Sequence, residues 1–286
     1  MAPMLPVSFT ARDGLTIPAY LTLPVGLEPY NLPVVVIVHG GPWHRDSWGF
    51  SNEVQFLANR GYAVLQPNFR GSTGFGREFL EASFGEWGLA MQDDITDGVI
   101  WLIEEGIADP DRIGIYGASY GGYAVLAGVT FTPDLFAAGI SYVGISSLFT
   151  LLESLPPHWE SQREMFYHRV GSPVYDYDRL RATSPLYHAD QITTPLFIAH
   201  GANDVRTTLI ESVQIVQALN NRGIDVEFMV KWDEGHGFIN EQNRLQFYRM
   251  MEAFFAEHLG GRSGNLLSDL DYTQTLQEVI DIMEQN

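Results

Sequence analysis

Short apolar runs alternate along this chain with stretches whose apolar positions recur at helical spacing. Six runs have the length and dense apolar character of buried strands: residues 34–38, 62–66, 113–116, 137–143, 195–199 and 226–230. Five stretches show helical spacing: residues 52–60, 91–105, a segment from 120 onward, 209–219 and 244–258. Because helices that follow strands pack on both faces of a sheet, the alternation predicts an α/β fold with a mostly parallel central sheet covered by helices on both faces.

Two segments of the main body depart from this alternation. At the start, Asp13-Gly14 divides the apolar-rich residues 7–23, which predicts an antiparallel hairpin. Residues 145–191 contain no clear strand, and we interpret them as a helical insertion over the carboxyl edge of the sheet. We therefore expect residues 1–262 to form a single domain that includes this insertion.

The C-terminal residues 263–286 follow a glycine-rich stretch and carry acidic but no basic side chains. Leu276, Val279, Ile280 and Met283 are spaced so that they fall on one face of a helix. We expect an acidic helical tail that packs on its own domain. A subunit contact in a homo-oligomer and a partial cover for the mouth of a binding site are the alternatives.

Composition narrows the range of partners. The 286 residues include 16 Lys and Arg against 35 Asp and Glu, a formal net charge of −19, which argues against nucleic acid and against an anionic membrane surface as partners. There is no cysteine, so disulfides, thiolate nucleophiles and Cys-ligated zinc are excluded. No apolar run reaches the roughly 18 residues of a membrane span, and the first residues lack the features of a signal peptide, so we expect a cytoplasmic protein.

The most informative pattern is Gly117-Ala118-Ser119-Tyr120-Gly121, a G-x-S-x-G sequence between a predicted strand and a predicted helix. Glycines two positions before and after the serine allow a sharp turn that lifts the hydroxyl above the sheet. We therefore expect Ser119 to be a nucleophile, with the amide N–H of Tyr120 as one donor to an oxyanion.

A serine hydroxyl needs a base to remove its proton, and an acid to orient that base. His236 stands between two glycines after the last predicted strand, and Asp204 lies in the loop after the preceding strand. Their order after Ser119 fits a triad in which Asp204 orients His236. A structural turn is the alternative for both residues, and Asp233 and Glu234 are the fallback acids.

Other chemistries have little support in the sequence. There is no phosphate-binding G-x-x-x-x-G-K-[ST] and no zinc-binding H-E-x-x-H pattern, so we expect neither a metal nor an organic cofactor. Residues 71–76 are rich in glycine without the spacing of a dinucleotide site, and we place them in a loop beside the catalytic residues. The acidic pair Asp93-Asp94 is expected on a solvated helix face.

Five ordered blocks of this sequence resemble the catalytic domain of the prolyl oligopeptidase family of serine peptidases, within the α/β-hydrolase fold. They are residues 39–42, 68–76, 117–123, 200–204 and 234–238. The first block, His39-Gly40-Gly41-Pro42, is most similar to the acylaminoacyl-peptidase branch of the family.

The resemblance implies roles for particular residues. It implies that Ser119, Asp204 and His236 form the catalytic triad and that Gly41 is the second donor to the oxyanion. It also implies that Arg206 binds a backbone carbonyl of the substrate, with an ion pair to a nearby acid as the alternative.

We expect a serine hydrolase that cleaves small peptides or aminoacyl amides through an acyl-enzyme. Family peptidases usually carry an N-terminal β-propeller, which this sequence does not contain, so a carboxylesterase with the same triad is the alternative. A non-catalytic binding module is a minor alternative. The substrate pocket is expected to be apolar, with four further candidates for its walls: Trp43, Tyr123, Val143 and Trp159.

Overall fold

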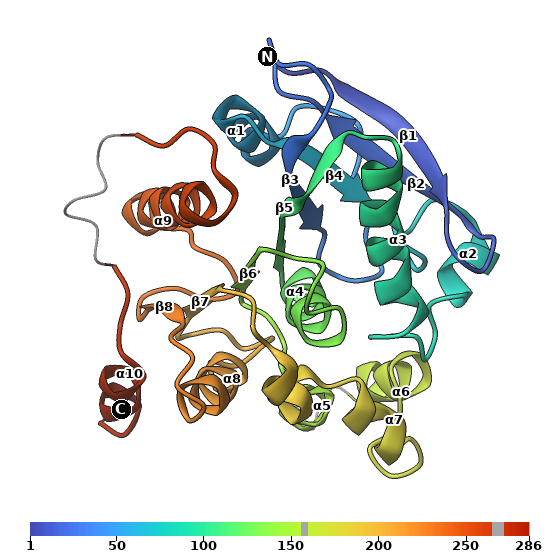
Figure 1. The fold of residues 1–286 in the computed structure, drawn as a ribbon. Coiled ribbons are helices and arrows are strands. Elements are labelled where there is room, and N and C mark those ends of the chain that lie inside the picture. Colours follow the sequence, from blue (N-terminus) through green and yellow to red (C-terminus); the bar gives the residue numbers. More distant parts are fainter. Residues whose placement is uncertain (156–159, 265–271, 286) are drawn as a thin grey trace.

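A single mixed sheet of eight strands organises the computed structural model, which describes residues 1–155, 160–264 and 272–285 (Figure 1). The strands are β1 (Met4–Thr10), β2 (Thr16–Thr22), β3 (Leu32–Val38), β4 (Ala63–Pro67), β5 (Ala108–Ala118), β6 (Ala138–Tyr142), β7 (Leu196–Gly201) and β8 (Glu227–Lys231). Their order in the sheet is β1-β2-β4-β3-β5-β6-β7-β8. The pairs β1–β2 and β2–β4 are antiparallel and the other five are parallel, which confirms the predicted α/β fold with a mostly parallel sheet.

Helices cover both faces of this sheet. They are α1 (Asn52–Arg60), α2 (Arg77–Glu81), α3 (Ala90–Glu104), α4 (Tyr120–Phe131), α5 (Leu148–Ser154), α6 (Glu160–Arg169), α7 (Tyr177–Ala182), a 3₁₀ helix (Pro185–Gln191), α8 (Ile210–Asn220), α9 (Glu241–Leu259) and α10 (Leu276–Met283). One hydrophobic core joins one sheet face to α3, α4 and α8, and a second joins the other face to α1 and α9. None of the helices in the described ranges is long and apolar enough to cross a membrane.

The segment between β6 and β7 contains α5, α6, α7 and the 3₁₀ helix, which Figure 1 shows grouped at one end of the molecule. Its described residues form no strand, in line with the helical insertion expected there. Because this insertion leaves the sheet at the carboxyl end of β6, it begins at the edge where parallel strands place their catalytic loops. The sequence pattern missed α2, a helix of five residues that directly follows the glycine-rich residues 71–76.

The C-terminal tail lies against the last strand of the sheet. The Gln274 amide N–H donates to the carbonyl of Phe228 at 2.7 Å, and the Val230 amide donates to the Gln274 side chain at 2.6 Å. Helix α10 begins at a capping box formed by Thr275 and buries Val279. These bonds occupy backbone groups on the free edge of β8, which would otherwise be open to another chain.

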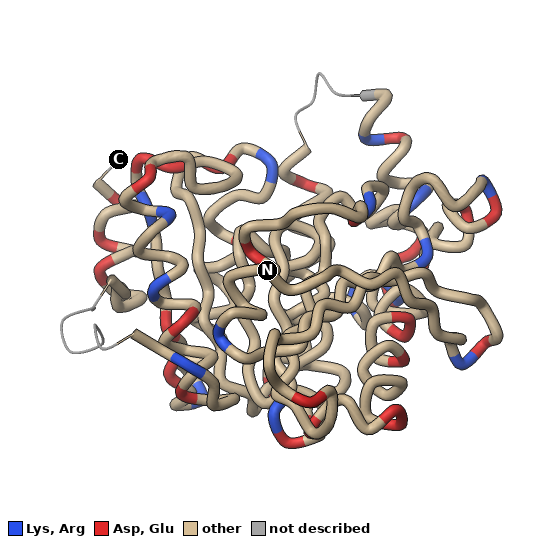
Figure 2. The backbone as a smooth tube through the Cα atoms, turned by 90° about the horizontal axis from the view of Figure 1, so that it is seen from above, with Lys and Arg blue, Asp and Glu red and all other residues tan. Residues whose placement is uncertain are grey.

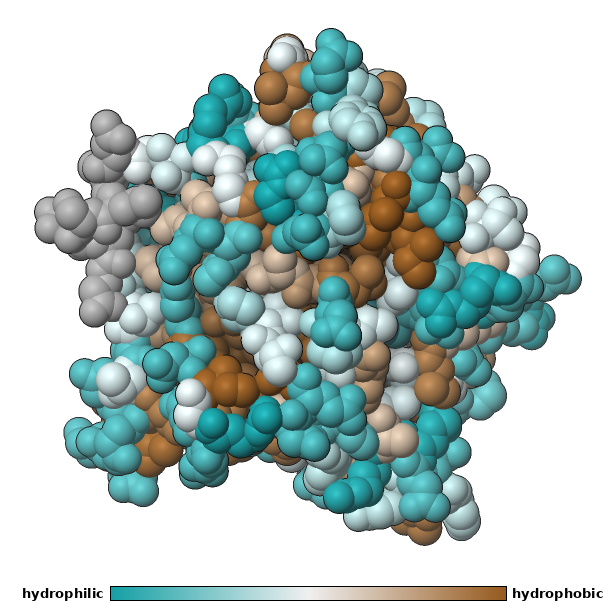
Figure 3. Space-filling view, in the orientation of Figure 1, coloured by the Kyte–Doolittle hydropathy of each residue, from teal (hydrophilic) through white to brown (hydrophobic). Residues whose placement is uncertain are grey.

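Charged positions are spread over many elements of the fold, as Figure 2 shows, and apolar surface on the face in Figure 3 is divided into separate patches.

The prediction that the acidic pair on α3 is solvated was wrong for Asp94, which is fully buried. Arg70 donates to the Asp94 carboxylate from its backbone N–H at 2.8 Å, from Nε at 2.9 Å and from a terminal nitrogen at 2.7 Å. A partner 24 positions away supplies the compensating charge that burial of a carboxylate requires, and no helical periodicity reveals such a partner.

Asp46 leads to a prediction about stability. Burial raises the pKa of this carboxyl to about 7, and Gln66 donates to it at 3.0 Å. Since the unfolded chain releases the same proton near pH 4, the folded state loses stability as the pH rises from about 4 to 7. Asp46→Asn removes the titrating group, so the change that it causes in the free energy of unfolding should favour the folded state more at pH 8 than at pH 4, by up to about 4 kcal/mol. Urea unfolding at both pH values measures this, and an equal effect at both would contradict it.

Candidate active site

Ser119 lies on a strained turn between β5 and α4. Its backbone has φ 60° and ψ −119°, and its N–H donates to the carbonyl of Tyr142 at 2.9 Å. A Cβ at Gly117 would lie 2.5 Å from the Gly121 backbone, and one at Gly121 would lie 2.0 Å from the Val38 carbonyl oxygen. The two glycines of G-x-S-x-G are therefore required by close backbone contacts, and the turn presents the serine side chain at the end of the sheet.

Asp204 lies in the loop after β7, buried and surrounded by donors. Its Oδ1 accepts hydrogen bonds from the backbone N–H groups of Arg206 at 2.8 Å and Thr207 at 3.1 Å. Its Oδ2 lies 2.6 Å from Nδ1 of His236 and accepts from the Thr207 hydroxyl at 3.0 Å. Burial works to raise the pKa of this carboxyl, but the hydrogen bonds from His236 and the two amides hold it below its usual value. The group is therefore an ionised acceptor at neutral pH.

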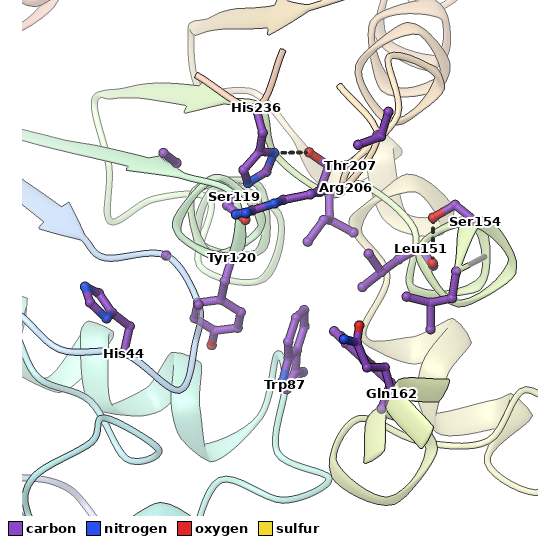
Figure 4. Close-up of a pocket in the computed structure, with 17 residues that line it drawn as sticks. His44, Trp87, Ser119, Tyr120, Leu151, Ser154, Gln162, Arg206, Thr207 and His236 are labelled. Atoms are coloured by element: carbon purple, nitrogen blue, oxygen red, sulfur yellow. Dashed lines mark hydrogen bonds between the residues drawn. The ribbon is translucent and has the colours of Figure 1, made fainter. Parts of the chain in front are cut away.

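His236 is presented by the loop between β8 and α9. Because Nδ1 donates to Asp204, Nε2 is the free acceptor of the neutral ring, and Figure 4 shows His236 beside Ser119. Glu234 braces the same loop by accepting from the backbone amides of Ile239 and Asn240, each at 2.8 Å. The fallback acid Glu234 is thus engaged elsewhere, and Asp204 is the carboxylate that contacts the imidazole.

The other fallback acid has a comparable role in the loop. Asp233 accepts hydrogen bonds from the side chain of Asn243 at 3.0 and 3.2 Å. A second histidine, His200, lies 3.7 Å from Asp204, but burial lowers its pKa to about 4. It therefore stays neutral and donates from Nε2 to the Thr207 carbonyl at 2.8 Å, which fixes the loop that carries Asp204.

Two backbone amides are available near the serine. Tyr120 is the first residue of α4, and the first N–H groups of a helix have no acceptor within it. The turn that contains Gly40 and Gly41 packs directly on the serine turn, since a Cβ at Gly40 would lie 2.9 Å from the Ala118 carbonyl oxygen. Gly41 has φ 125°, which side-chain-bearing residues rarely adopt. Both Gly41 and Tyr120 line the same cavity as Ser119.

That cavity has a volume of about 690 Å³ and is mainly apolar. Its apolar wall is formed by Trp87, Tyr120, Ile145, Leu151, Leu155 and Phe166. Arg206, His44 and Gln162 add polar groups, and among the described lining residues there is no aspartate or glutamate. Figure 4 shows Trp87, Tyr120 and Gln162 on one side of the space and Arg206 next to Ser119 and His236. The cavity therefore suits an apolar side chain beside a polar backbone.

Only some of the pocket residues expected from the sequence line this cavity. Arg206 lines the cavity, whereas Tyr123 is buried behind it and donates from its hydroxyl to the Thr183 carbonyl at 2.7 Å. Val143 is buried in the core with φ 45°, and Trp43 lies outside the lining residues. Trp159 falls outside the described residues. Sequence reasoning missed Trp87, Leu151 and Phe166, because no local motif distinguishes them from other apolar residues.

Comparison with known proteins agrees with this geometry. The sequence model of the prolyl oligopeptidase family matches residues 48–262. Dipeptidyl aminopeptidase BIII of Pseudoxanthomonas mexicana is 47% identical over 272 residues, and the match covers 92% of this chain and 40% of that protein. A puromycin-hydrolyzing peptidase of Mycobacterium tuberculosis matches with a TM-score of 0.85 and 30% identity, over 92% of this chain and 40% of that one. The acylaminoacyl peptidase of Pyrococcus horikoshii matches with a TM-score of 0.83 and 27% identity, over 98% of this chain and 44% of that one.

The chain thus spans about two fifths of the length of the curated relatives that it matches, as it does for dipeptidyl aminopeptidase BIII. The family match covers most of the sequence, including the serine turn and the loops that carry Asp204 and His236. The solved structures reproduce the same α/β-hydrolase architecture at more than 25% identity. By sequence and by fold, this chain belongs to the prolyl oligopeptidase family of serine peptidases.

Proposed function

We propose that this chain is a serine hydrolase of the prolyl oligopeptidase type that cleaves acyl bonds of small peptides or aminoacyl amides. The observation that carries the proposal is the 2.6 Å contact between His236 Nδ1 and Asp204, with Ser119 beside the imidazole at the wall of one cavity. A serine that lies next to a histidine, which is itself hydrogen-bonded to a carboxylate, is a nucleophile beside an oriented base.

The steps follow from these positions. Ser119 Oγ attacks the substrate carbonyl carbon while His236 Nε2 removes its proton, and Asp204 stabilises the resulting imidazolium. The amides of Tyr120 and Gly41 bind the oxyanion of the tetrahedral intermediate. His236 then gives the proton to the leaving amine or alcohol, and an acyl-enzyme remains. Water attacks this ester in the same way, with His236 as the base, and releases Ser119 and the acid product.

The lining of the cavity supports an apolar substrate side chain next to the scissile bond. Arg206 is exposed and forms no ion pair with any acid in the described part of the chain. This favours the proposal that its guanidinium binds a backbone carbonyl of the substrate over the ion-pair alternative. A carboxylesterase remains the alternative, because the same groups act on esters. A cytoplasmic location and a homo-oligomer stay predictions.

A matched pair of substrates tests the proposed function. We expect the purified chain to cleave both a short-chain nitrophenyl ester and an acyl-aminoacyl nitroanilide, with kcat/KM measured for each. Cleavage of the ester alone would assign the alternative, a carboxylesterase. Failure of the folded chain to react with either substrate or with a fluorophosphonate would overturn the enzyme assignment and leave the binding module.

A further inference from the structure

We propose that Trp43 and Arg169 form a stacked unit that ties the oxyanion turn to the insertion helix α6, so that a bulky substrate side chain in the cavity positions the Gly41 amide. This inference rests on the proposed function and extends it to the dependence of acylation on side-chain size. Trp43 and Arg169 are positioning residues, because neither lines the cavity.

The stack is formed by one cation and two rings. The Arg169 guanidinium carbon lies 4.7 Å from the centre of the Trp43 ring and 5.1 Å from that of Phe84. No acid within residues 1–155, 160–264 and 272–285 forms an ion pair with Arg169. The attraction between the guanidinium and the two aromatic faces is therefore the main contact of this charge.

Trp43 joins three parts of the site. It follows Gly41 by two residues, and a Cβ on Gly41 would lie only 2.9 Å from the Trp43 backbone nitrogen. Its ring centre lies 5.8 Å from that of Phe166 and 6.5 Å from that of Trp87, both of which line the cavity. Its Nε1 donates to the Ser83 hydroxyl at 3.3 Å. A shift of either cavity wall is therefore transmitted to the residue that anchors the oxyanion turn.

The end of α6 is hydrogen-bonded to the turn at residues 83–85, which contains Phe84. The Gly85 amide donates to the Arg169 carbonyl at 2.7 Å. Arg179 donates to the carbonyls of Gly85 and Val170, each at 2.8 Å. These bonds join the end of helix α6 to the turn at residues 83–85, and Trp43 contacts both through Phe166 and Ser83.

A substrate side chain that fills the cavity contacts Phe166 and Trp87 and presses the two walls against Trp43. In this arrangement binding energy from the side chain fixes an oxyanion donor, which accelerates the chemical step and not merely the binding step. A small side chain leaves the walls without this support, so its acylation depends less on the stack.

The test compares Arg169→Gln and Arg169→Lys with the parent on N-acetyl-phenylalanine and N-acetyl-alanine 4-nitrophenyl esters. Burst kinetics give the acylation rate constant and the dissociation constant of each ester. We expect Arg169→Gln to lower the acylation rate constant about 5- to 30-fold for the phenylalanine ester and less than about 2-fold for the alanine ester. Arg169→Lys, which keeps the charge, should lie between the parent and Arg169→Gln.

Arg181→Gln is the matched control, because Arg181 stacks on Tyr187 at 4.5 Å and neither residue lines the cavity. It should leave both esters unaffected. Trp43→Phe keeps an aromatic face, loses the bond to Ser83 and should show the same dependence on side-chain size. Equal losses on both esters, or a change confined to the dissociation constant, would overturn the inference. A parent chain that neither acylates nor reacts with a fluorophosphonate would instead overturn the proposed function.

Discussion

Replacing Ser119 by alanine is expected to lower kcat on an ester or anilide by about 10⁵- to 10⁶-fold. The substitution removes the attacking oxygen and leaves the amides of Tyr120 and Gly41, which by themselves retain some acceleration over water. Since alanine keeps a Cβ at the strained φ of 60°, the turn should keep its shape. Steady-state kinetics and loss of fluorophosphonate labelling measure the effect.

Two controls separate lost chemistry from lost structure. The thermal unfolding midpoint of Ser119→Ala should stay within a few degrees of the parent, because one hydroxyl is removed. Ser8→Ala, on the exposed face of β1, should retain full activity and full labelling. If Ser119→Ala kept more than a tenth of the parent activity while folded, another nucleophile would have to be sought.

The catalytic loops could be predicted from the sequence because each one carries a local requirement that the sequence displays. Gly117 and Gly121 are needed where backbones approach within van der Waals contact, so the serine turn is visible as a pattern. Asp204 and His236 follow predicted strands, and parallel strands bring such loops to one edge. Chain order and strand alternation together were therefore enough to find residues that lie far apart in the sequence.

The cavity walls could not be predicted in the same way. Phe166 and Leu151 come from the insertion, whose packing depends on tertiary contacts that no repeat period records. Tyr120 and Tyr123 are three residues apart on α4 and both buried, yet only Tyr120 lines the cavity. Asp94 was expected to be solvated, but its carboxylate is buried and is paired with Arg70, which lies 24 positions away in the sequence. In each case the deciding neighbour is remote in sequence.

Replacing Asp204 by asparagine is expected to lower kcat by about 10⁴-fold with little change in substrate binding. Oδ1 of Asp204 accepts two backbone N–H groups, from Arg206 and Thr207, so an asparagine places its carbonyl oxygen there. Its NH₂ group then faces Nδ1 of His236, which must act as an acceptor. The proton moves to Nε2, on the side of Ser119, and the imidazole can no longer take the serine proton.

Asp233→Asn is the matched control, since Asp233 is the acid nearest to His236 in sequence apart from the loop-bracing Glu234, and it bonds to Asn243 instead. Its kcat should stay within a few fold of the parent, because the imidazole keeps its tautomer. Both variants change an aspartate to an asparagine, but Asp233 is three residues from His236 in the sequence and Asp204 is 32 residues away. If proximity in sequence decided the acid, Asp233→Asn would lose more activity, whereas the spatial contact predicts the larger loss for Asp204→Asn. A larger loss in Asp233→Asn than in Asp204→Asn would move the acid of the triad to the fallback position and leave the 2.6 Å contact of Asp204 with no catalytic role.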